Sequence, residues 1–271
     1  MATSVRTSWQ VMRASVTALF IRNIQKKFIT NINSSRTLGI FMIFLEPLLH
    51  VGMWMMLRSA FNMGERGSLP MPLFILLGAI PFLFLRHVIS KSTSIIKSTK
   101  DLFNFRQVRP IDPILAGLIS EFAIHIMILF MILSAFSWVG VVWSVHDLTY
   151  LLLNTVSFVI FVFGISLIFA IACFFFTIVK TAMTVFMRIF YMLSGIFFSA
   201  DMLPEPARVI MLYNPLFQYI EMMRQCFNQV TVHTDYTDPA YLFKCAVVVL
   251  FLGLSLYVTY RDKIMIEIEQ R

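Results

Sequence analysis

Two glutamates in apolar stretches of the sequence are each followed by a histidine four residues later. The pairs are Glu46 with His50 and Glu121 with His125. On an α-helix this spacing brings a carboxylate and an imidazole to the same face. Ionisable side chains within apolar segments are energetically costly and therefore mark functional sites. The two pairs predict either mutual neutralisation of charge or a relay for protons.

Arg188 is a third ionisable residue of this kind. Counted at 1.5 Å per helical residue, Glu46, Glu121 and Arg188 lie roughly 12, 10 and 9 Å from the inner ends of their apolar segments. One interpretation is that Arg188 bridges to a carboxylate and so avoids an unpaired charge in lipid. The other is that it contacts an anionic substrate, which the glutamates would repel. We interpret the glutamates as structural and leave both roles open for Arg188.

Aromatic side chains surround Arg188 in the sequence. On a helix, Tyr191 and Phe198 would share the face of Arg188, whereas Phe190 and Phe197 would share another face. Aromatic rings can stack on flat faces of a substrate, although in membrane helices they commonly serve packing. The candidate substrate contacts are Arg188, Tyr191, Phe198, Phe190, Phe197, Phe41, Phe44, Arg86 and Lys91. The last two are basic residues at the expected cytoplasmic entry, which the usual excess of positive charge on the inner side explains equally well.

The composition shows which elements must position these residues. Hydrophobic residues make up 59% of the 271 residues and charged residues only 13%, which is too few charges for the surface of a soluble domain. Apolar runs of about 20 residues predict transmembrane helices. We therefore expect an all-α integral membrane protein whose domain 38–260 has six spans, at 38–57, 72–89, 114–138, 148–176, 182–198 and 241–260.

Two of these six spans are weak. Pro81, Arg86 and His87 interrupt the second, and the fifth is short and contains Arg188. Both remain long enough to cross if the helix tilts or the bilayer thins. In the first span, Pro47 next to Glu46 removes a backbone hydrogen bond and predicts a kink, either static or acting as a hinge.

The formal charge of +8 reports topology and contact with anionic lipid rather than a nucleic-acid partner. Segments 1–37 and 86–113 are rich in basic residues and are expected in the cytoplasm, whereas the loops 58–72, 139–149 and 199–240 are poorer in positive charge and are expected outside. An even number of spans returns the tail 261–271 to the cytoplasm. Both termini are therefore predicted to be cytoplasmic.

Three segments outside the spans carry further predictions. Within 1–37, apolar residues at helical spacing predict an amphipathic helix on the inner membrane surface. Segment 97–112 is polar and basic with a short apolar core, and it predicts a short cytoplasmic docking helix. Segment 200–230 forms two helical pieces broken at Asn214 and Pro215, which predicts two half-buried helices at the outer surface.

Two of these regions resemble a known family. The stretch SGIFFSADMLPEPARVIMLYNPLFQYIEMMRQCF, Ser194 to Phe227, resembles the fifth span and outer re-entrant hairpin of type-two ABC export permeases. The stretch FRQVRPIDPILA, Phe105 to Ala116, narrows the resemblance to the KpsM-type membrane subunit of capsular polysaccharide exporters. The six spans, surface helix and docking helix agree with this family along nearly the whole chain.

The resemblance implies a homodimer bound to two KpsT-like ATPase subunits in a Gram-negative inner membrane. It would export a lipid-linked acidic polysaccharide towards a KpsE-like periplasmic copolymerase and a KpsD-like outer-membrane channel. Segment 97–112 would then be a coupling helix, with candidate ATPase contacts at Asp101, Leu102, Phe103, Phe105, Arg106 and Arg109. The alternative for these residues is a basic loop near anionic lipid.

The chain itself is not expected to be an enzyme or to hold a cofactor. None of its ten glycines precedes a lysine, so it lacks a phosphate-binding loop, and ATP and Mg²⁺ would be bound by the partner. Cys173, Cys226 and Cys245 are an odd number at unrelated spacings and predict neither disulfides nor a metal site.

Other functions remain as alternatives. The same family could export O-antigen or teichoic acid. An intramembrane glycolipid enzyme is less favoured because no HExxH, acidic metal motif or nucleophile elbow occurs. A proton-coupled transporter would use the Glu–His pairs as a relay, but it would normally show repeated halves, and none is found.

Overall fold

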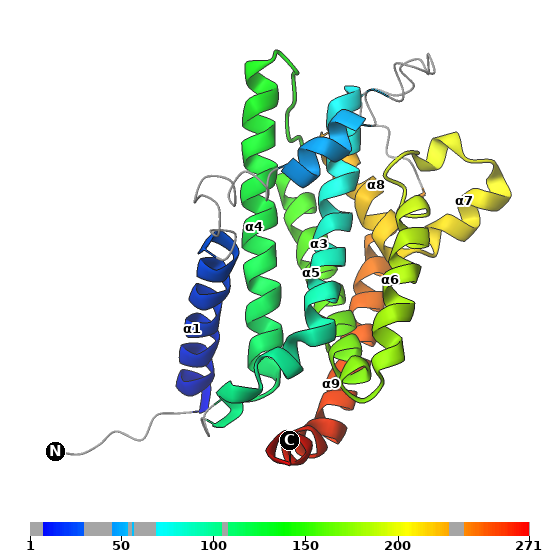
Figure 1. Ribbon diagram of the computed structural model, residues 1–271. Helices are drawn as coiled ribbons and strands as arrows, with labels where there is room; N and C mark the ends of the chain where they lie inside the picture. The colour runs from blue at the N-terminus through cyan, green and yellow to red at the C-terminus, as the bar shows by residue number, and fades with distance from the viewer. Residues whose placement is uncertain are drawn as a thin grey trace.

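The computed structural model describes residues 8–29, 45–53, 56, 69–104, 108–227 and 236–270. Within these ranges all regular structure is helical (Figure 1). The elements in chain order are α1 (Ser8–Ile29), α3 (Met71–Ser98), η1 (Lys100–Asn104), α4 (Ile111–Trp138), α5 (Leu148–Phe175), α6 (Thr177–Met192), η2 (Ala200–Met202), α7 (Glu205–Leu212), α8 (Pro215–Phe227) and α9 (Pro239–Glu269). Residues 45–53 are also helical.

Among the described residues, four helices are long and apolar enough to cross a membrane, namely α3, α4, α5 and α9. They cover the segments predicted as spans at 72–89, 114–138, 148–176 and 241–260. Of the predicted first span, 38–57, only residues 45–53 and 56 are described. A kink at Pro47 and the total of six spans therefore stay predictions.

The predicted fifth span differs from the observed helix. Helix α6 begins earlier than 182 and ends at Met192, and its 16 residues extend about 24 Å, less than the roughly 30 Å hydrocarbon core. Residues 193–199 are not helical. Gly195 there has a φ of +81°, which an L-residue rarely adopts. A Cβ on Gly195 would also lie 2.3 Å from the Phe217 ring, so this position requires glycine.

Helix α3, predicted as a weak span, is the central helix. Most of its apolar length is buried (83%), and it packs against α4, α5, α6 and α8. Pro72 lies in its first turn, where a missing N–H costs nothing, and Pro81 is accommodated within it. Figure 1 shows α3 and α5 in the middle of the bundle, with α4 on one side and α6 on the other.

Helices α5 and α9 make the most extensive helix pair. A Cβ added to Gly164 on α5 would lie 2.6 Å from the backbone nitrogen of Leu250, and a Cβ on Gly253 of α9 would lie 2.7 Å from the carbonyl oxygen of Gly164. Two glycines thus let the backbones cross at close range. Helix α9 continues through most of 261–271, so the predicted tail is largely a helical extension of the last span.

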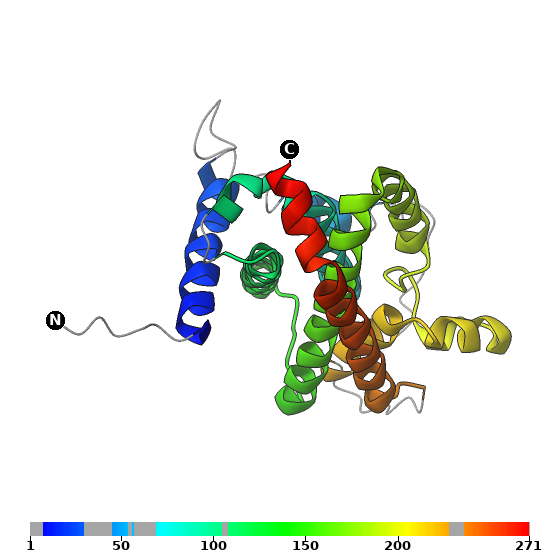
Figure 2. The same cartoon turned by 90° about the horizontal axis from the view of Figure 1, so that it is seen from below.

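Helix α1 confirms the predicted N-terminal helix but is not isolated from the bundle. It packs against α4, with Leu19 buried and Trp9 exposed. In Figure 2 α4 is viewed down its axis, whereas α1 is viewed from the side. The two helices are therefore inclined to one another. The placement of α1 on the inner membrane surface stays a prediction.

The hairpin predicted over 200–230 contains α7 and α8, but its two helices are not equally half-buried. Helix α7 has no buried residue and projects from the bundle (Figure 1). Eleven of the thirteen residues of α8 are buried because α8 packs against α3 and α5. Figure 1 also places η1 and the end of α9 at the end of the molecule opposite α7.

The predicted coupling helix over 97–112 is divided among three elements. Helix α3 runs on to Ser98, η1 is a 3₁₀-helix of five residues, and α4 begins at Ile111. Among the described residues of this segment there is thus no separate α-helix. Thr99 is the C-cap residue of α3, and its hydroxyl donates to the Ile95 carbonyl at 2.7 Å.

Replacing Gly164 with leucine should separate α5 from α9, because backbone atoms of α9 occupy the space beside it. We expect a free energy of unfolding lower by about 1–3 kcal/mol. Thermal unfolding of the purified chain in detergent measures this change. Gly52→Leu is the matched control because no atom of the described residues lies within 4 Å of a Cβ added at Gly52. Equal melting temperatures for the two variants would contradict the close crossing.

Candidate functional site

A cavity of about 480 Å³ lies between α3, α6 and the helical residues 45–53. Three of its lining side chains are cations, Arg86, Lys180 and Arg188, and none of the described lining residues is acidic. The remainder of the lining is apolar or hydroxylated: His50, Phe82, Ile89, Ser90, Thr93, Met183, Thr184, Met187 and Tyr191. The cavity therefore concentrates positive charge beside an aromatic wall, which suits a large anionic ligand.

The arginine predicted in this region is not neutralised by a described carboxylate. Arg188 is exposed, and no ion pair joins it to a described acidic residue. Of the two roles left open for Arg188, the bridge to a glutamate is not seen among the described residues. Arg86 makes that contact instead, with its Nη1 lying 3.3 Å from Oε1 of Glu46.

Tyr191 gathers the aromatic side chains at this cavity. Its ring centroid lies 5.4 Å from that of His50, 5.0 Å from Phe82 and 5.1 Å from Phe197. The first two rings also line the cavity. Edge-to-face and tilted contacts of this kind hold rings in fixed orientations, so the aromatic wall is preorganised.

The helical wheel assigned two phenylalanines to the wrong faces because α6 ends at Met192. Phe197, predicted on the other face, lies on Tyr191. Phe198 instead lies 6.1 Å from the Phe217 ring of α8. Phe190 stacks on Phe186 at 5.4 Å and is not among the cavity-lining residues. Phe41 and Phe44 lie outside the described residues.

A second cavity of about 490 Å³ lies on the other side of α3, against α1 and α4. Buried Glu121 anchors it, with Nζ of Lys27 at 2.6 Å from Oε2 and Nζ of Lys91 at 3.5 Å from Oε1. Lys91 thus belongs to this cavity and not to the one that holds Arg86. Ser90 lines both cavities.

The two Glu–His pairs share a geometry, but not the one that the spacing predicted. In each pair Nδ1 of the histidine contacts the backbone carbonyl of its glutamate, at 3.0 Å for His50 and 2.7 Å for His125. The carboxylates turn away to cations on other helices. Direct carboxylate–imidazole neutralisation within each pair is therefore wrong, and a structural role for the glutamates is consistent with their ion pairs.

The sequence reasoning missed a buried ion pair on α8. Arg224 and Glu221 are joined at 2.8 Å, and their side chains are only 4% and 7% exposed. The guanidinium also donates to the backbone carbonyls of Phe74 at 3.2 Å, Ile196 at 2.9 Å and Phe198 at 3.2 Å. The other oxygen of Glu221 accepts from the hydroxyl of Ser199 at 2.8 Å.

This ion pair fixes the non-helical turn after α6 to α3 and α8. Gly78 on α3 makes room for it, since a Cβ there would lie 2.8 Å from Nη2 of Arg224 and 2.9 Å from Cα of Ile196. The only sequence signal is the spacing of Glu221 and Arg224, three residues apart among apolar neighbours. The topology prediction counted Glu221 and Arg224 among the charges of the outer loop 199–240, and their pairing was therefore not considered.

The candidate ATPase contacts fall into three groups. Asp101 and Arg109 are exposed and Leu102 is half-buried. Phe103 is only 6% exposed and packs with Ile114 and Phe174 in an apolar cluster at the lower end of the bundle, so its side chain is part of the core. Phe105 and Arg106 lie outside the described residues.

These features define an integral membrane protein with a cationic cavity and with ion pairs that join its helices. The profile of the ABC-2 type transporter family matches residues 3–228. The chain belongs to this family.

Named relatives match almost end to end. The chain is 27% identical over 263 residues to the polysialic acid transport protein KpsM of Escherichia coli, covering 96% of this chain and 98% of the relative. It is 26% identical over 253 residues to the capsule polysaccharide export inner-membrane protein CtrC of Neisseria meningitidis serogroup A, and 26% identical over 255 residues to BexB of Haemophilus influenzae, each time over 93% of both chains.

Replacing Arg224 with methionine should leave Glu221 and three carbonyl groups without their buried donor. Removing one partner of a buried pair costs about 3–5 kcal/mol, so the melting temperature in detergent should fall strongly. Arg208→Met is the control, because Arg208 lies on exposed α7 and donates to a single carbonyl, that of Leu203. If the melting temperature of the Arg224 variant falls no further than that of this control, the buried pair does not hold the non-helical turn after α6.

Proposed function

We propose that this chain is the membrane subunit of an ATP-driven exporter of capsular polysaccharide. Membership in the ABC-2 type transporter family supports the transporter class. The likeness to a polysialic acid transport protein, KpsM, and to two capsule polysaccharide export proteins, CtrC and BexB, supports the substrate class. Capsule export is favoured over O-antigen or teichoic acid export because the relatives that match over nearly the whole chain are capsule exporters. The chain would be a permease and not itself an enzyme.

The cavity between α3 and α6 is the main observation that supports a substrate path through this chain. An acidic polysaccharide with a lipid anchor presents negative charges and sugar faces together. Arg86, Lys180 and Arg188 would attract the charges, and Tyr191 with Phe82 would stack on the sugars without requiring one linkage. Arg188 and Lys180 are stronger candidates than Arg86, because Arg86 is already paired with Glu46 whereas no described carboxylate is paired with either of the other two.

The energy would come from a separate KpsT-like ATPase that binds ATP and Mg²⁺. The end of the bundle that carries η1 would face it, and the exposed residues Asp101 and Arg109 are the described candidates for that contact. The buried Phe103 would instead transmit movement of η1 to α4 and α5, against which it packs. This assigns the cytoplasm to the end with η1 and the end of α9.

The remaining parts of the assembly follow from the same family. A second copy of this chain would complete the channel, and two ATPase subunits would bind the pair. The exposed α7, at the opposite end, would lie at the outer surface, where a KpsE-like copolymerase and a KpsD-like channel would receive the polymer. Both termini would then be cytoplasmic in a Gram-negative inner membrane.

Arg188→Gln should reduce export several-fold while leaving assembly with the ATPase unchanged, because it removes a cation from the cavity without removing an internal ion pair. Capsule at the cell surface and copurification of the coexpressed ATPase are the two measurements. Lys244→Gln, an exposed cation on α9 outside the cavity, is the control. Normal export by the Arg188 variant would rule out its contact with substrate.

Asp101→Arg should weaken copurification of the ATPase and lower ATP-coupled export, because it reverses a charge on the exposed surface of η1. Asp262→Arg is matched to it as an exposed charge reversal, on α9. If both variants retain the ATPase equally, η1 is not the coupling surface and contact with anionic lipid explains its charges.

A proton-coupled transporter remains the rival class, since histidines and carboxylates meet beside α3. Transport by the isolated chain under a proton gradient, without the ATPase, would favour that rival. Transport only with the ATPase and ATP favours the exporter.

A further inference from the structure

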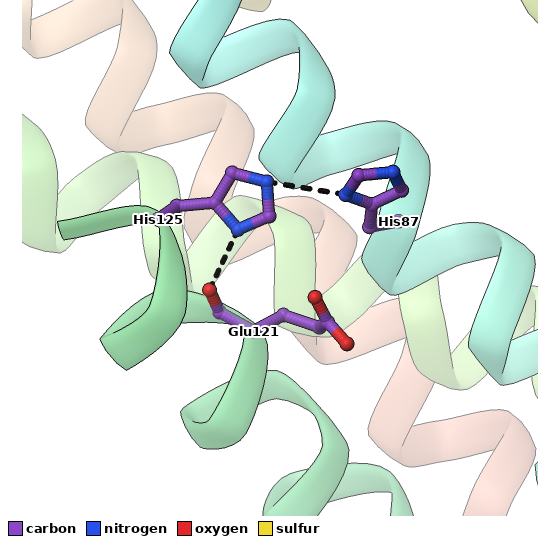
Figure 3. Close-up of side chains that lie close together, drawn as sticks. All are labelled: His87, Glu121 and His125. Atoms are coloured by element: carbon purple, nitrogen blue, oxygen red, sulfur yellow. Dashed lines mark hydrogen bonds between the residues drawn. The ribbon is translucent and has the colours of Figure 1, made fainter. Parts of the chain in front are cut away.

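We propose that His87, His125 and Glu121 form a binding site for a divalent transition-metal ion of the zinc type. The three residues come from α3 and α4, and their potential ligand atoms all lie within 4.8 Å of one another. Figure 3 shows the two imidazole rings facing each other, with the Glu121 side chain beside them. The sequence predicted no metal site, because His87 lies far from the other two residues along the chain.

The ring nitrogens are oriented as metal ligands are. Nδ1 of His125 lies 2.7 Å from the Glu121 carbonyl oxygen, which only accepts, so this nitrogen carries the proton and Nε2 presents its lone pair. Nε2 of His87 lies 3.2 Å from a carboxylate oxygen of Glu46, which orients the other ring in the same manner. A carbonyl or a carboxylate on the far nitrogen is the usual second shell of a metal-bound histidine.

The two remaining nitrogens, Nδ1 of His87 and Nε2 of His125, lie 3.2 Å apart. With both far nitrogens protonated and both rings neutral, the two near nitrogens each present a lone pair, which a proton or a metal ion between them would satisfy. Two imidazole nitrogens on one tetrahedral zinc ion, each about 2.0–2.1 Å from it, are separated by about 3.3 Å. A bound metal thus fits with little movement of either ring.

Glu121 and the cavity would complete the coordination. All three residues line the cavity of about 490 Å³, which has room for water as a fourth ligand. Imidazole and carboxylate ligands suit Zn²⁺ and its neighbours rather than Ca²⁺. A proton shared by the imidazoles satisfies the same two nitrogens and leaves the Glu121 carboxylate with Lys27 and Lys91, so the test must distinguish a metal ion from a proton.

Lys27 of α1 makes the proposal specific. Its ammonium group lies 2.6 Å from the Glu121 carboxylate, and with Lys91 and Arg86 it opposes a bound cation. Metal and Lys27 therefore compete for one carboxylate. Occupation of the site would weaken the Lys27–Glu121 ion pair between α1 and α4, which couples the ion to the docking of the N-terminal helix.

The test is titration of the purified, chelator-stripped full chain with Co²⁺, followed by visible absorption, and with Zn²⁺, followed by metal analysis. We expect one ion per chain, and binding at least about tenfold weaker in His87→Gln and His125→Gln. His50→Gln and His146→Gln should bind normally, since neither residue belongs to the cluster. Lys27→Gln should bind about tenfold more tightly, because it removes a competing charge.

Several outcomes would overturn the site. Wild-type protein that binds no ion, with both ring nitrogens of His87 protonated by ¹⁵N NMR, would show that the cluster holds only a proton. Binding unchanged in both histidine variants, or unchanged in Lys27→Gln, would place the ion elsewhere. The wild-type and Lys27 measurements decide the question even if the histidine variants fail to fold.

Discussion

A charge inside a lipid bilayer needs a partner, and much of this bundle is arranged around that requirement. Glu121 on α4 receives lysines from α1 and α3, and Glu46 receives an arginine from α3. Arg224 on α8 is satisfied by a carboxylate and by carbonyls of α3 and of the turn after α6. Each of these three clusters includes a contact from α3, through Lys91, Arg86 or the Phe74 carbonyl, so the charges and the central helix depend on one another.

This dependence explains why the most polar span is also the most enclosed. Arg86 and His87 would be costly on a helix that faces lipid, but neighbouring helices supply their partners within the protein. The charge of the surface changes where the described residues provide no carboxylate partners for the cations. Beyond Arg86, the cations of α6 have no described carboxylate, and the cavity that they line is positive. Helix α3 thus has one side on which the charges are paired and another side that faces a cavity open to an anion.

The two cavities put α3 between the proposed substrate path and the proposed metal site. Ser90 lines both, and α3 carries Arg86 into one and Lys91 into the other. A shift of α3 that follows movement of η1 would change both cavities together, because η1 follows α3 directly along the chain. The proposed metal site lies on the side that also holds α1, so the ion would act on the same helix from the opposite face.

The sequence by itself determined the membrane class, four of the spans and the existence of the N-terminal helix, because long apolar runs and helical periodicity are local properties. It also carried the family resemblance. Only the tertiary structure decided which charges meet. Glu46 and Glu121 turn to cations on other helices, which no spacing along one helix can show.

The end of α6 shows the same limit. A helical wheel over 182–198 grouped Phe198 with Arg188, but Gly195 adopts a left-handed conformation and Phe197 takes that place near Tyr191. The buried Glu221–Arg224 pair had only a three-residue spacing as its signal. His87 and His125 are 38 residues apart and meet because α3 and α4 pack side by side. Contacts between helices depend on which faces pack together, and that information is not local to any segment.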